Sequence, residues 1–167
     1  MLESSLSYIG LGGNLGEVGV NFERTLAAMD SWADSTLESV SRIYSSPPMG
    51  PLDQPDYLNA VAALRTSRSP LDLLCALQGL ERDAGRVSGG QRWGARELDL
   101  DLLLYDNLQF EHARLQIPHP GLHLRAFVIH PLAEIAPQLV VPGYGSVASI
   151  AARTDASTLT VLQAPST

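Results

Sequence analysis

The sequence predicts an α+β fold: a ferredoxin-like antiparallel sheet (strand–helix–strand–strand–helix–strand) with its helices on one face and a C-terminal extension. Apolar stretches with strand character predict the strands at residues 6–11, 37–44, 57–66 and 99–105. Apolar residues at helical spacing predict the helices at residues 17–32 and 71–84. The length of 167 residues suits a single domain, 1–167. Many functions use this fold, so it does not identify an activity.

The first strand leads into a glycine-rich turn at residues 12–16, Gly-Gly-Asn-Leu-Gly, and then into the first helix. The expected buried stripe of that helix consists of Phe22, Leu26, Met29 and Trp32. A glycine-rich turn before a helix can bind phosphate, but glycine also serves any tight connection between a strand and a helix. We favour the structural role.

The third strand brings an aromatic and an amide side chain onto one face. Because side chains alternate along a strand, Tyr57, Asn59 and Val61 share a face. This pair suits a flat heterocycle through stacking and hydrogen bonds, although an ordinary structural role is simpler for these two residues alone. The preceding loop, residues 45–55, is rich in turn-forming residues and long, which is typical of a lid or binding loop.

The second helix has a clear start, with Ser69 as the N-cap and Pro70 in the first turn. Cys75 within it is expected to be packed against the core. Gln78 and Glu81 lie three residues apart and therefore form a polar pair on one helix face.

Two aspartates, Asp99 and Asp101, interrupt the fourth strand and project from the same face. Two neighbouring carboxylates are costly to bury unless cations neutralise them, and magnesium is commonly held by one or two carboxylates plus substrate phosphates. Four arginines stand upstream, at positions 82, 86, 92 and 96. They are either a solvated charged segment or phosphate ligands, and beside the aspartates they indicate a metal–phosphate site.

Composition excludes several classes of protein. The net charge of −7 argues against a general nucleic-acid binder. All 11 basic residues are arginine, so a Walker P-loop and a Schiff-base mechanism, which both need lysine, are excluded. The absence of a long apolar run, a signal-like N-terminus and a second cysteine favours a cytoplasmic protein without membrane contact.

Beyond the fourth strand, the pattern predicts a hairpin-like pair at 108–117, a helix at 124–136, a short helix at 147–153 and a final strand at 159–162. His119 and His123 are four residues apart. Pro120 and Gly121 between them make a helical zinc-binding pair improbable.

Taken in order, several motifs resemble the family of 6-hydroxymethyl-7,8-dihydropterin pyrophosphokinases. They are Gly-Leu-Gly-Gly-Asn-Leu-Gly (10–16), Pro-Pro-Met-Gly (47–50), Gln-Pro-Asp-Tyr-Leu-Asn-Ala (54–60), Gly-Arg-Val (85–87), Arg-Trp-Gly-Ala-Arg-Glu-Leu-Asp-Leu-Asp (92–101), Pro-His-Pro (118–120), Arg-Ala-Phe (125–127) and Pro-Leu-Ala-Glu-Ile-Ala-Pro (131–137). Each motif alone is modest, but their joint order and spacing over residues 8–142 are specific. The family transfers pyrophosphate from ATP to a pterin hydroxymethyl group in folate biosynthesis and releases AMP.

The resemblance implies roles for individual residues. Asp99 and Asp101 would hold two magnesium ions that bridge the ATP phosphates. The residues implied in ATP binding are Gln78, Glu81, Arg86, Arg92, Arg96, His119 and Arg125. The residues implied around the pterin are Pro47, Pro48, Met49, Tyr57, Asn59, Trp93 and Phe127. Of these sets, Arg86, Arg96, Asp99 and Asp101 would be catalytic, and Trp93 would lie on a loop that closes over both substrates.

The sequence departs from the usual family pattern at Gly13, Ser88, Ala95 and Pro120; Ser88 stands where a second basic residue is common. The implied partners are the two small-molecule substrates, with no nucleic acid and no obligate protein partner. Two alternatives share the topology: a regulatory domain that senses a small ligand, and an RNA-binding domain, which the acidic charge and the 6% aromatic content disfavour.

Overall fold

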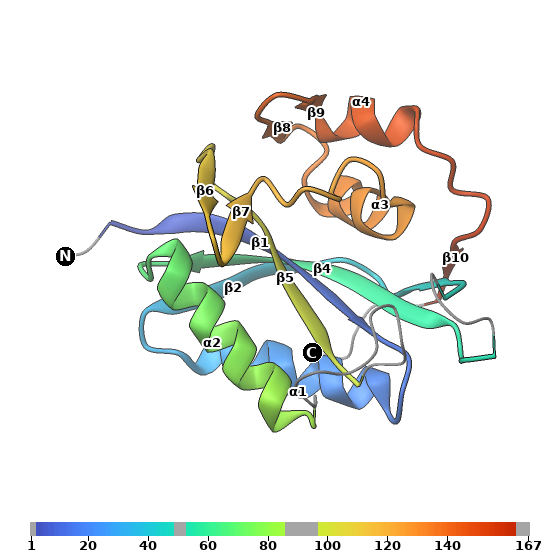
Figure 1. Cartoon of the computed structure of the whole chain (residues 1–167), viewed down its shortest axis with the longest axis horizontal. Coiled ribbons are helices and arrows are strands. Elements are labelled where there is room, and N and C mark those ends of the chain that lie inside the picture. The colour runs from blue at the N-terminus through green and yellow to red at the C-terminus, as the bar shows by residue number, and fades with distance from the viewer. Residues whose placement is uncertain (1–2, 49–52, 86–96, 163–167) are drawn as a thin grey trace.

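The computed structural model describes residues 3–48, 53–85 and 97–162 (Figure 1). These residues form a mixed α/β fold built around an antiparallel sheet. The elements in chain order are β1 (Ser5–Gly13), α1 (Val18–Ser31), β2 (Ser35–Val40), β3 (Tyr44–Ser46), β4 (Tyr57–Thr66), α2 (Pro70–Asp83), β5 (Asp99–Tyr105), β6 (Phe110–His112), β7 (Leu115–Ile117), α3 (Ala126–Ile135), β8 (Val140–Val141), β9 (Gly145–Ser146), α4 (Val147–Ala152) and β10 (Thr160–Val161).

The main sheet has the order β10-β3-β4-β1-β5, and β2 pairs with the C-terminal half of β4. Every strand pair in it is antiparallel. The prediction of one strand over 37–44 is wrong, because β2 and β3 are separate strands. The Ser41 hydroxyl accepts the Val61 N–H at 2.9 Å, so a side chain replaces a backbone carbonyl and interrupts the ladder.

Helices cover both faces of the sheet (Figure 1). On one face, α1 and α2 bury Phe22, Met29, Leu73 and Leu77 against alternate residues of the central strands. Full burial of a side chain such as Phe22 contributes roughly 1.5–3 kcal/mol. On the other face, α3 and α4 pack over the remaining residues of the strands, with Ile129, Leu132 and Ile150 in that second core. The C-terminal extension therefore forms a third layer.

Two local predictions need correction. β1 continues to Gly13, so the predicted turn at 12–16 shortens to the residues after it, where Gly16 adopts a φ of +68°. Cys75 is exposed, not packed, because Leu73 and Leu77 occupy the buried stripe of α2 and place Cys75 on the far side of the helix.

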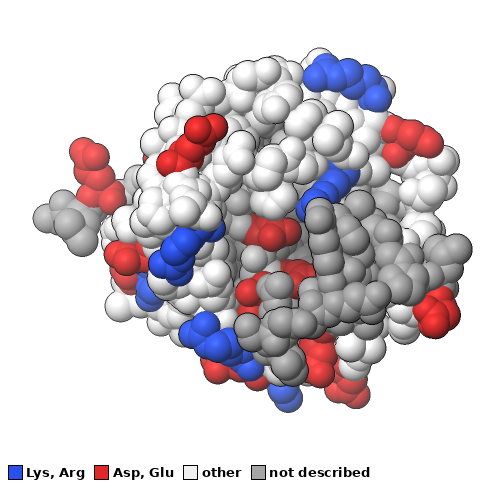
Figure 2. All heavy atoms as spheres, viewed as in Figure 1, with Lys and Arg blue, Asp and Glu red and all other residues white. Residues whose placement is uncertain are grey.

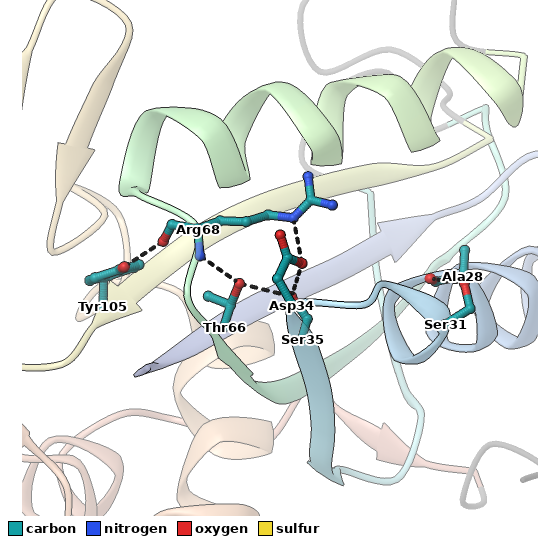
Figure 3. Close-up of polar contacts among 7 residues, drawn as sticks. All are labelled: Ala28, Ser31, Asp34, Ser35, Thr66, Arg68 and Tyr105. Atoms are coloured by element: carbon teal, nitrogen blue, oxygen red, sulfur yellow. Dashed lines mark hydrogen bonds and ion pairs between the residues drawn. The ribbon is translucent and has the colours of Figure 1, made fainter. Parts of the chain in front are cut away.

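A polar network closes the end of the sheet at which β4 and β5 terminate (Figure 3). The guanidinium of Arg68 donates to Asp34 at 3.0 Å, and its backbone N–H donates to the Thr66 hydroxyl at 3.1 Å. Ser35 donates to the same Thr66 hydroxyl at 2.8 Å, and the Tyr105 hydroxyl donates to the Arg68 carbonyl at 2.5 Å. The network ties the start of β2 to the ends of β4 and β5.

A second polar link joins α3 to β3. The carboxylate of Glu134 accepts hydrogen bonds from the Tyr44 hydroxyl at 2.5 Å and from the Arg42 backbone N–H at 2.8 Å. The Arg42 guanidinium completes the contact at 3.2 Å. Burial and the bond to Glu134 raise the pKa of Tyr44 to about 12, so Tyr44 stays a protonated donor.

Replacing Glu134 by glutamine is expected to cost about 1 kcal/mol of stability at pH 7. Burial disfavours ionisation of Glu134, but hydrogen bonds from Tyr44 and Arg42 outweigh it and hold its pKa below the ordinary 4.5. A carboxyl whose pKa is lowered by folding stabilises the protein above its ordinary pKa and loses that effect as the pH falls through the lowered value. Urea denaturation should therefore show a parent–E134Q gap that closes below pH 4.5.

The control for this prediction is E38Q, which alters the exposed contact between Glu38 and Arg65 and should barely change stability. A loss in E134Q that is the same at acidic and neutral pH would contradict the ionised link.

Gly13→Ala is expected to destabilise the chain by about 1–3 kcal/mol. A Cβ at Gly13 would lie 2.6 Å from the backbone carbonyl oxygen of Glu97, so backbone must move. Gly19→Ala is the matched control, because its Cβ would meet nothing within 4 Å and alanine favours the helix by up to about 1 kcal/mol. Chemical denaturation of both variants checks the pair; equal stability of Gly13→Ala and the parent would contradict the close approach.

Candidate active site

The register of the central strands aligns residues of β5, β1 and β4 on one face of the sheet. Gly12 of β1 pairs with Asp99 of β5 on one side and with Asn59 of β4 on the other. Gly10 pairs in the same way with Asp101 and Val61. Directly paired residues of an antiparallel sheet point to the same face, so the carboxylates and the amide share the face that α3 covers in part.

The two glycines leave the middle of this face without side chains. A Cβ at Gly12 would lie 3.3 Å from Oδ1 of Asn59, and one at Gly10 would contact the side chain of Leu103 at 3.6 Å. The strip between the acidic pair and Asn59 is therefore backbone, with the Leu103 side chain packed against Gly10 and the Asn59 amide beside Gly12.

Two features position the acidic pair: the buried leucines that alternate with it on β5, and the carboxylate of Glu81 on α2. Leu100 and Leu102 alternate with Asp99 and Asp101 and are buried under α1 and α2, which turns both carboxylates to the opposite face. Glu81 of α2 is 6% exposed, and its carboxylate accepts the Leu100 N–H at 2.8 Å. Because β5 is an edge strand, Glu81 supplies the acceptor that a further strand would otherwise give.

His119 lies next to the acidic pair. Its backbone N–H donates to the Leu103 carbonyl at 2.9 Å, and its Nδ1 accepts the Gly121 N–H at 3.1 Å. A neutral ring must then carry its proton on Nε2, which lies 3.8 Å from Oδ1 of Asp101. Burial lowers the pKa of His119, and the positive charge of Arg125 lowers it further. The negative charge of Asp101 acts in the other direction but does not offset them.

Asn59 is fixed by a buried hydrogen bond. Its Nδ2 donates to the Ser46 hydroxyl at 2.8 Å, and both residues are almost fully buried. Its Oδ1 faces Gly12. Tyr57, two residues earlier on β4, shares this face by alternation and pairs with Ser46.

Asn14 anchors the segment before β4. This side chain is 5% exposed, and its Nδ2 donates to the Gln54 side chain and to the Pro55 carbonyl, both at 2.9 Å. The bonds join the end of β1 to the start of the strand that carries Tyr57 and Asn59.

The start of α3 contributes two further residues of the predicted site. Arg125 is the N-cap residue of α3, and its guanidinium carbon lies 6.0 Å from the centre of the Phe127 ring. Phe127 packs in part against the core under α3. A Cβ at Gly121 would lie 2.7 Å from Nε of Arg125, so the glycine makes room for this side chain.

Gln78 lies farther along the α2 side, where its Oε1 accepts from the Arg114 guanidinium at 3.4 Å. Pro47 and Pro48 follow β3 directly. Five other predicted residues fall outside the described part of the chain: Met49, Arg86, Arg92, Trp93 and Arg96. Figure 2 shows some acidic side chains near the middle of this view and others around its rim, with basic side chains spaced between them.

The described residues could bind a hard cation whose remaining ligands are waters and substrate phosphates. No group of three or more His, Cys, Asp and Glu side chains among them forms a metal cluster. Asp101 has a side chain 46% exposed and therefore accessible, and Asp99 shares its face. Two carboxylate donors suit magnesium, which keeps waters and substrate phosphates as its remaining ligands, and do not suit a closed zinc site.

The sequence pattern predicts no role for Ser46 or Glu134, and it does not predict that Glu81 supports β5. A buried polar residue has a weak sequence signal unless its partner is known, and these partners lie 13, 90 and 19 residues away. Asn14 was visible only as part of the glycine-rich motif.

Relatives with known names share most of this chain. A family model for 7,8-dihydro-6-hydroxymethylpterin-pyrophosphokinase (HPPK) matches residues 8–137. The chain is 46% identical over 135 residues to the 2-amino-4-hydroxy-6-hydroxymethyldihydropteridine pyrophosphokinase of Pseudomonas aeruginosa, an alignment that covers 81% of this chain and 83% of the relative. The enzyme of the same name from Haemophilus influenzae is 48% identical over 136 residues, covering 81% of this chain and 84% of the relative.

Solved structures agree at the level of the fold. The crystal structure of wild-type Plasmodium falciparum HPPK-DHPS with pteroate aligns with a TM-score of 0.72 at 11% identity, covering 92% of this chain and 43% of that one. This chain thus spans slightly less than half of that protein. The family match over residues 8–137 and identities of 46% and 48% confirm the resemblance seen in the motifs: the chain belongs to the 7,8-dihydro-6-hydroxymethylpterin-pyrophosphokinase family.

Proposed function

We propose that this face of the sheet binds both substrates of the pyrophosphokinase reaction, ATP against Asp99 and Asp101 and the pterin against Tyr57 and Asn59. As a member of its family, the chain transfers pyrophosphate from ATP to the hydroxymethyl group of 6-hydroxymethyl-7,8-dihydropterin in folate biosynthesis. The products are AMP and the pterin diphosphate.

The observation that carries the proposal is the pairing of Gly12 with both Asp99 and Asn59. Two strand spacings separate the acidic strand from the amide strand, a distance of about 10 Å. A pterin held at Asn59 can therefore extend its hydroxymethyl group across the glycine strip toward phosphates held at the acidic pair. Bringing the attacking oxygen and the phosphorus into aligned near contact is the main contribution an enzyme makes to phosphoryl-type transfer.

The pterin half recognises a flat, polar ring. Asn59 offers Oδ1 as an acceptor, and the bond from one N–H of its Nδ2 to Ser46 fixes the orientation of the amide. Tyr57 and Phe127 supply the aromatic faces for stacking, and Pro47, Pro48 and Met49 cover the ring. Met49 lies outside the described residues.

The nucleotide half has to balance negative charge. Asp99 and Asp101 would hold two magnesium ions, which would neutralise the phosphates and polarise the reacting phosphorus. His119, Arg125, Gln78 and Glu81 are proposed to line the nucleotide from the described part of the chain. Arg86, Arg92, Arg96 and the closing residue Trp93 complete this proposal from residues outside it.

In the reaction, the pterin hydroxyl oxygen attacks the β-phosphorus of ATP, in line with the bond that is to break. The bond from the β-phosphorus to the bridging oxygen of the α-phosphate breaks, AMP leaves with the bond's electron pair, and the hydroxyl proton passes to solvent. The chain positions both groups, stabilises the spreading phosphate charge and must exclude water, which would otherwise hydrolyse ATP.

The proposal also includes the finer architecture and setting. We assign the order β5-β1-β4-β2, with α1 and α2 on one face, to the ferredoxin-like arrangement within one domain, 1–167. The proposed partners are the two small substrates, without nucleic acid or an obligate protein partner. The single cysteine supports a cytoplasmic location. None of the helices in the described ranges is long and apolar enough to cross a membrane.

The acidic pair gives the sharpest test of the proposal. The parent with magnesium, ATP and 6-hydroxymethyl-7,8-dihydropterin should release AMP, whereas D99N and D101N should each lose about a hundred- to a thousandfold in kcat. Chromatographic measurement of AMP over time checks both expectations. D72N is the matched control, because Asp72 lies in the exposed first turn of α2.

Near-parental turnover in both D99N and D101N would refute the metal–phosphate assignment. No AMP from the parent would instead favour the ligand-sensing alternative.

Asn59→Ala is expected to raise the KM for the pterin by about tenfold and to leave the KM for ATP near the parent value. The substitution removes a buried acceptor on the pterin side but touches nothing on β5. Steady-state kinetics with each substrate varied in turn separates the two constants. Asn107→Ala, in the exposed turn after β5, provides the control; a rise in the KM for ATP as large as that for the pterin would contradict the division of the site.

A further inference from the structure

The short strand β3 sets the geometry of the pterin half. Its pairing with β4 consists of Tyr44 with Asn59, Ser45 with Leu58 and Ser46 with Tyr57. Ser46 orients the Asn59 amide, and the residues that follow β3 are the proposed pterin cover. A strand of three residues is only marginally stable when it pairs with a neighbouring strand on one side.

The outer edge of β3 is covered by the strand closest to the C-terminus. Thr160 of β10 pairs with Ser45, and Val161 pairs with Tyr44. The Leu162 N–H then donates to the Ile43 carbonyl at 2.8 Å. Figure 1 shows the chain running from α4, at the top of the view, down to β10, the strand that pairs with β3.

The connection to β10 is tied down on its way. Nε2 of His130 on α3 lies 2.9 Å from the Thr154 carbonyl, so this ring nitrogen donates to it. The Asp155 carboxylate accepts from the backbone N–H and from the hydroxyl of Ser157, each at 2.9 Å. The Leu159 N–H donates to the Ala156 carbonyl at 3.0 Å. These bonds deliver β10 to β3 in a defined position.

β10 contributes backbone hydrogen bonds more than apolar burial. Val161 is 41% exposed and Leu162 is 51% exposed, so neither side chain belongs to a core. β10 also lies beyond residues 8–137, the range over which the family model matches. Burial of apolar side chains therefore does not account for the pairing of β10 with β3. The pairing acts on β3, whose outer edge it covers.

We propose that β10 is a positioning strand for pterin binding. It holds the outer edge of β3, so that Ser46 keeps the Asn59 amide oriented and the cover starts from a fixed point. Glu134 holds the same strand through the side chain of Tyr44, whereas β10 pairs with the backbone of Tyr44 and Ser45. The inference rests on the proposed function, because it assigns β10 to the pterin half of that site.

The test compares Leu162→Pro with Leu162→Ala. Proline removes the N–H that donates to Ile43, whereas alanine keeps the N–H and trims an exposed side chain by a similar amount. Binding of 6-hydroxymethylpterin is measured by its own fluorescence, in magnesium and a non-hydrolysable ATP analogue. L162P should weaken pterin binding by about two- to tenfold, the effect of losing one backbone hydrogen bond. L162A should match the parent.

Affinity for the ATP analogue and thermal stability are measured on the same three proteins. The inference requires that L162P change pterin affinity and leave nucleotide affinity at the parent value. Equal loss of both affinities with a lower Tm would make β10 a general stabiliser and overturn the inference. Unchanged pterin binding in L162P would overturn this inference and leave the proposed function standing. A parent protein that binds no pterin would overturn both.

Discussion

The pairing of β1 with β4 on one side and with β5 on the other is the constraint on which the site depends. Asn59 and Asp99 face each other across Gly12 only in this register. A slip of one residue would turn every side chain of the slipped strand to the opposite face. Leu100 and Ala60, which are buried under the helices α1 and α2, would then leave the core. Hydrophobic packing on one face therefore specifies the arrangement of polar groups on the other.

The two halves of the site lie on strands that need support from outside the central pairing. Glu81 accepts the Leu100 N–H at the open edge of β5, midway between the two aspartates. On the opposite side, Glu134 and β10 brace β3. Unpaired edges of a sheet shift and associate readily, so side-chain acceptors and short covering strands keep such edges in place. These supports fix the positions of β5 and β3 and thereby of the proposed substrate-binding residues that follow or pair with them.

Local pattern was enough to place the long elements and the shared face of Asp99 and Asp101. The predicted strand at 57–66 coincides with β4, because its residues form a nearly continuous apolar run that is buried on both faces of the sheet. Pattern failed where a distant partner decided the local structure. Ser41 separates β2 from β3 through a bond to Val61, twenty residues away, and periodicity along the chain carries no trace of it. The apolar-like Cys75 was expected in the core, yet the Leu73–Leu77 stripe had already filled that side of α2.

The two halves of the proposed site depend on different interactions, electrostatic for the nucleotide and stacking with hydrogen bonding for the pterin. This difference is consistent with the glycine backbone that separates them. ATP approaches a chain of net charge −7 and, within it, a pair of carboxylates, so long-range electrostatics oppose binding. In the proposed site, magnesium ions and arginines near the phosphates would have to reverse that repulsion locally. The proposed pterin contacts are stacking and a hydrogen bond to an oriented amide, which ionic strength would hardly screen. In the proposed site, a charged side chain at Gly10 or Gly12 would extend the electrostatic field of one half into the other, whereas glycine backbone would keep the two halves independent.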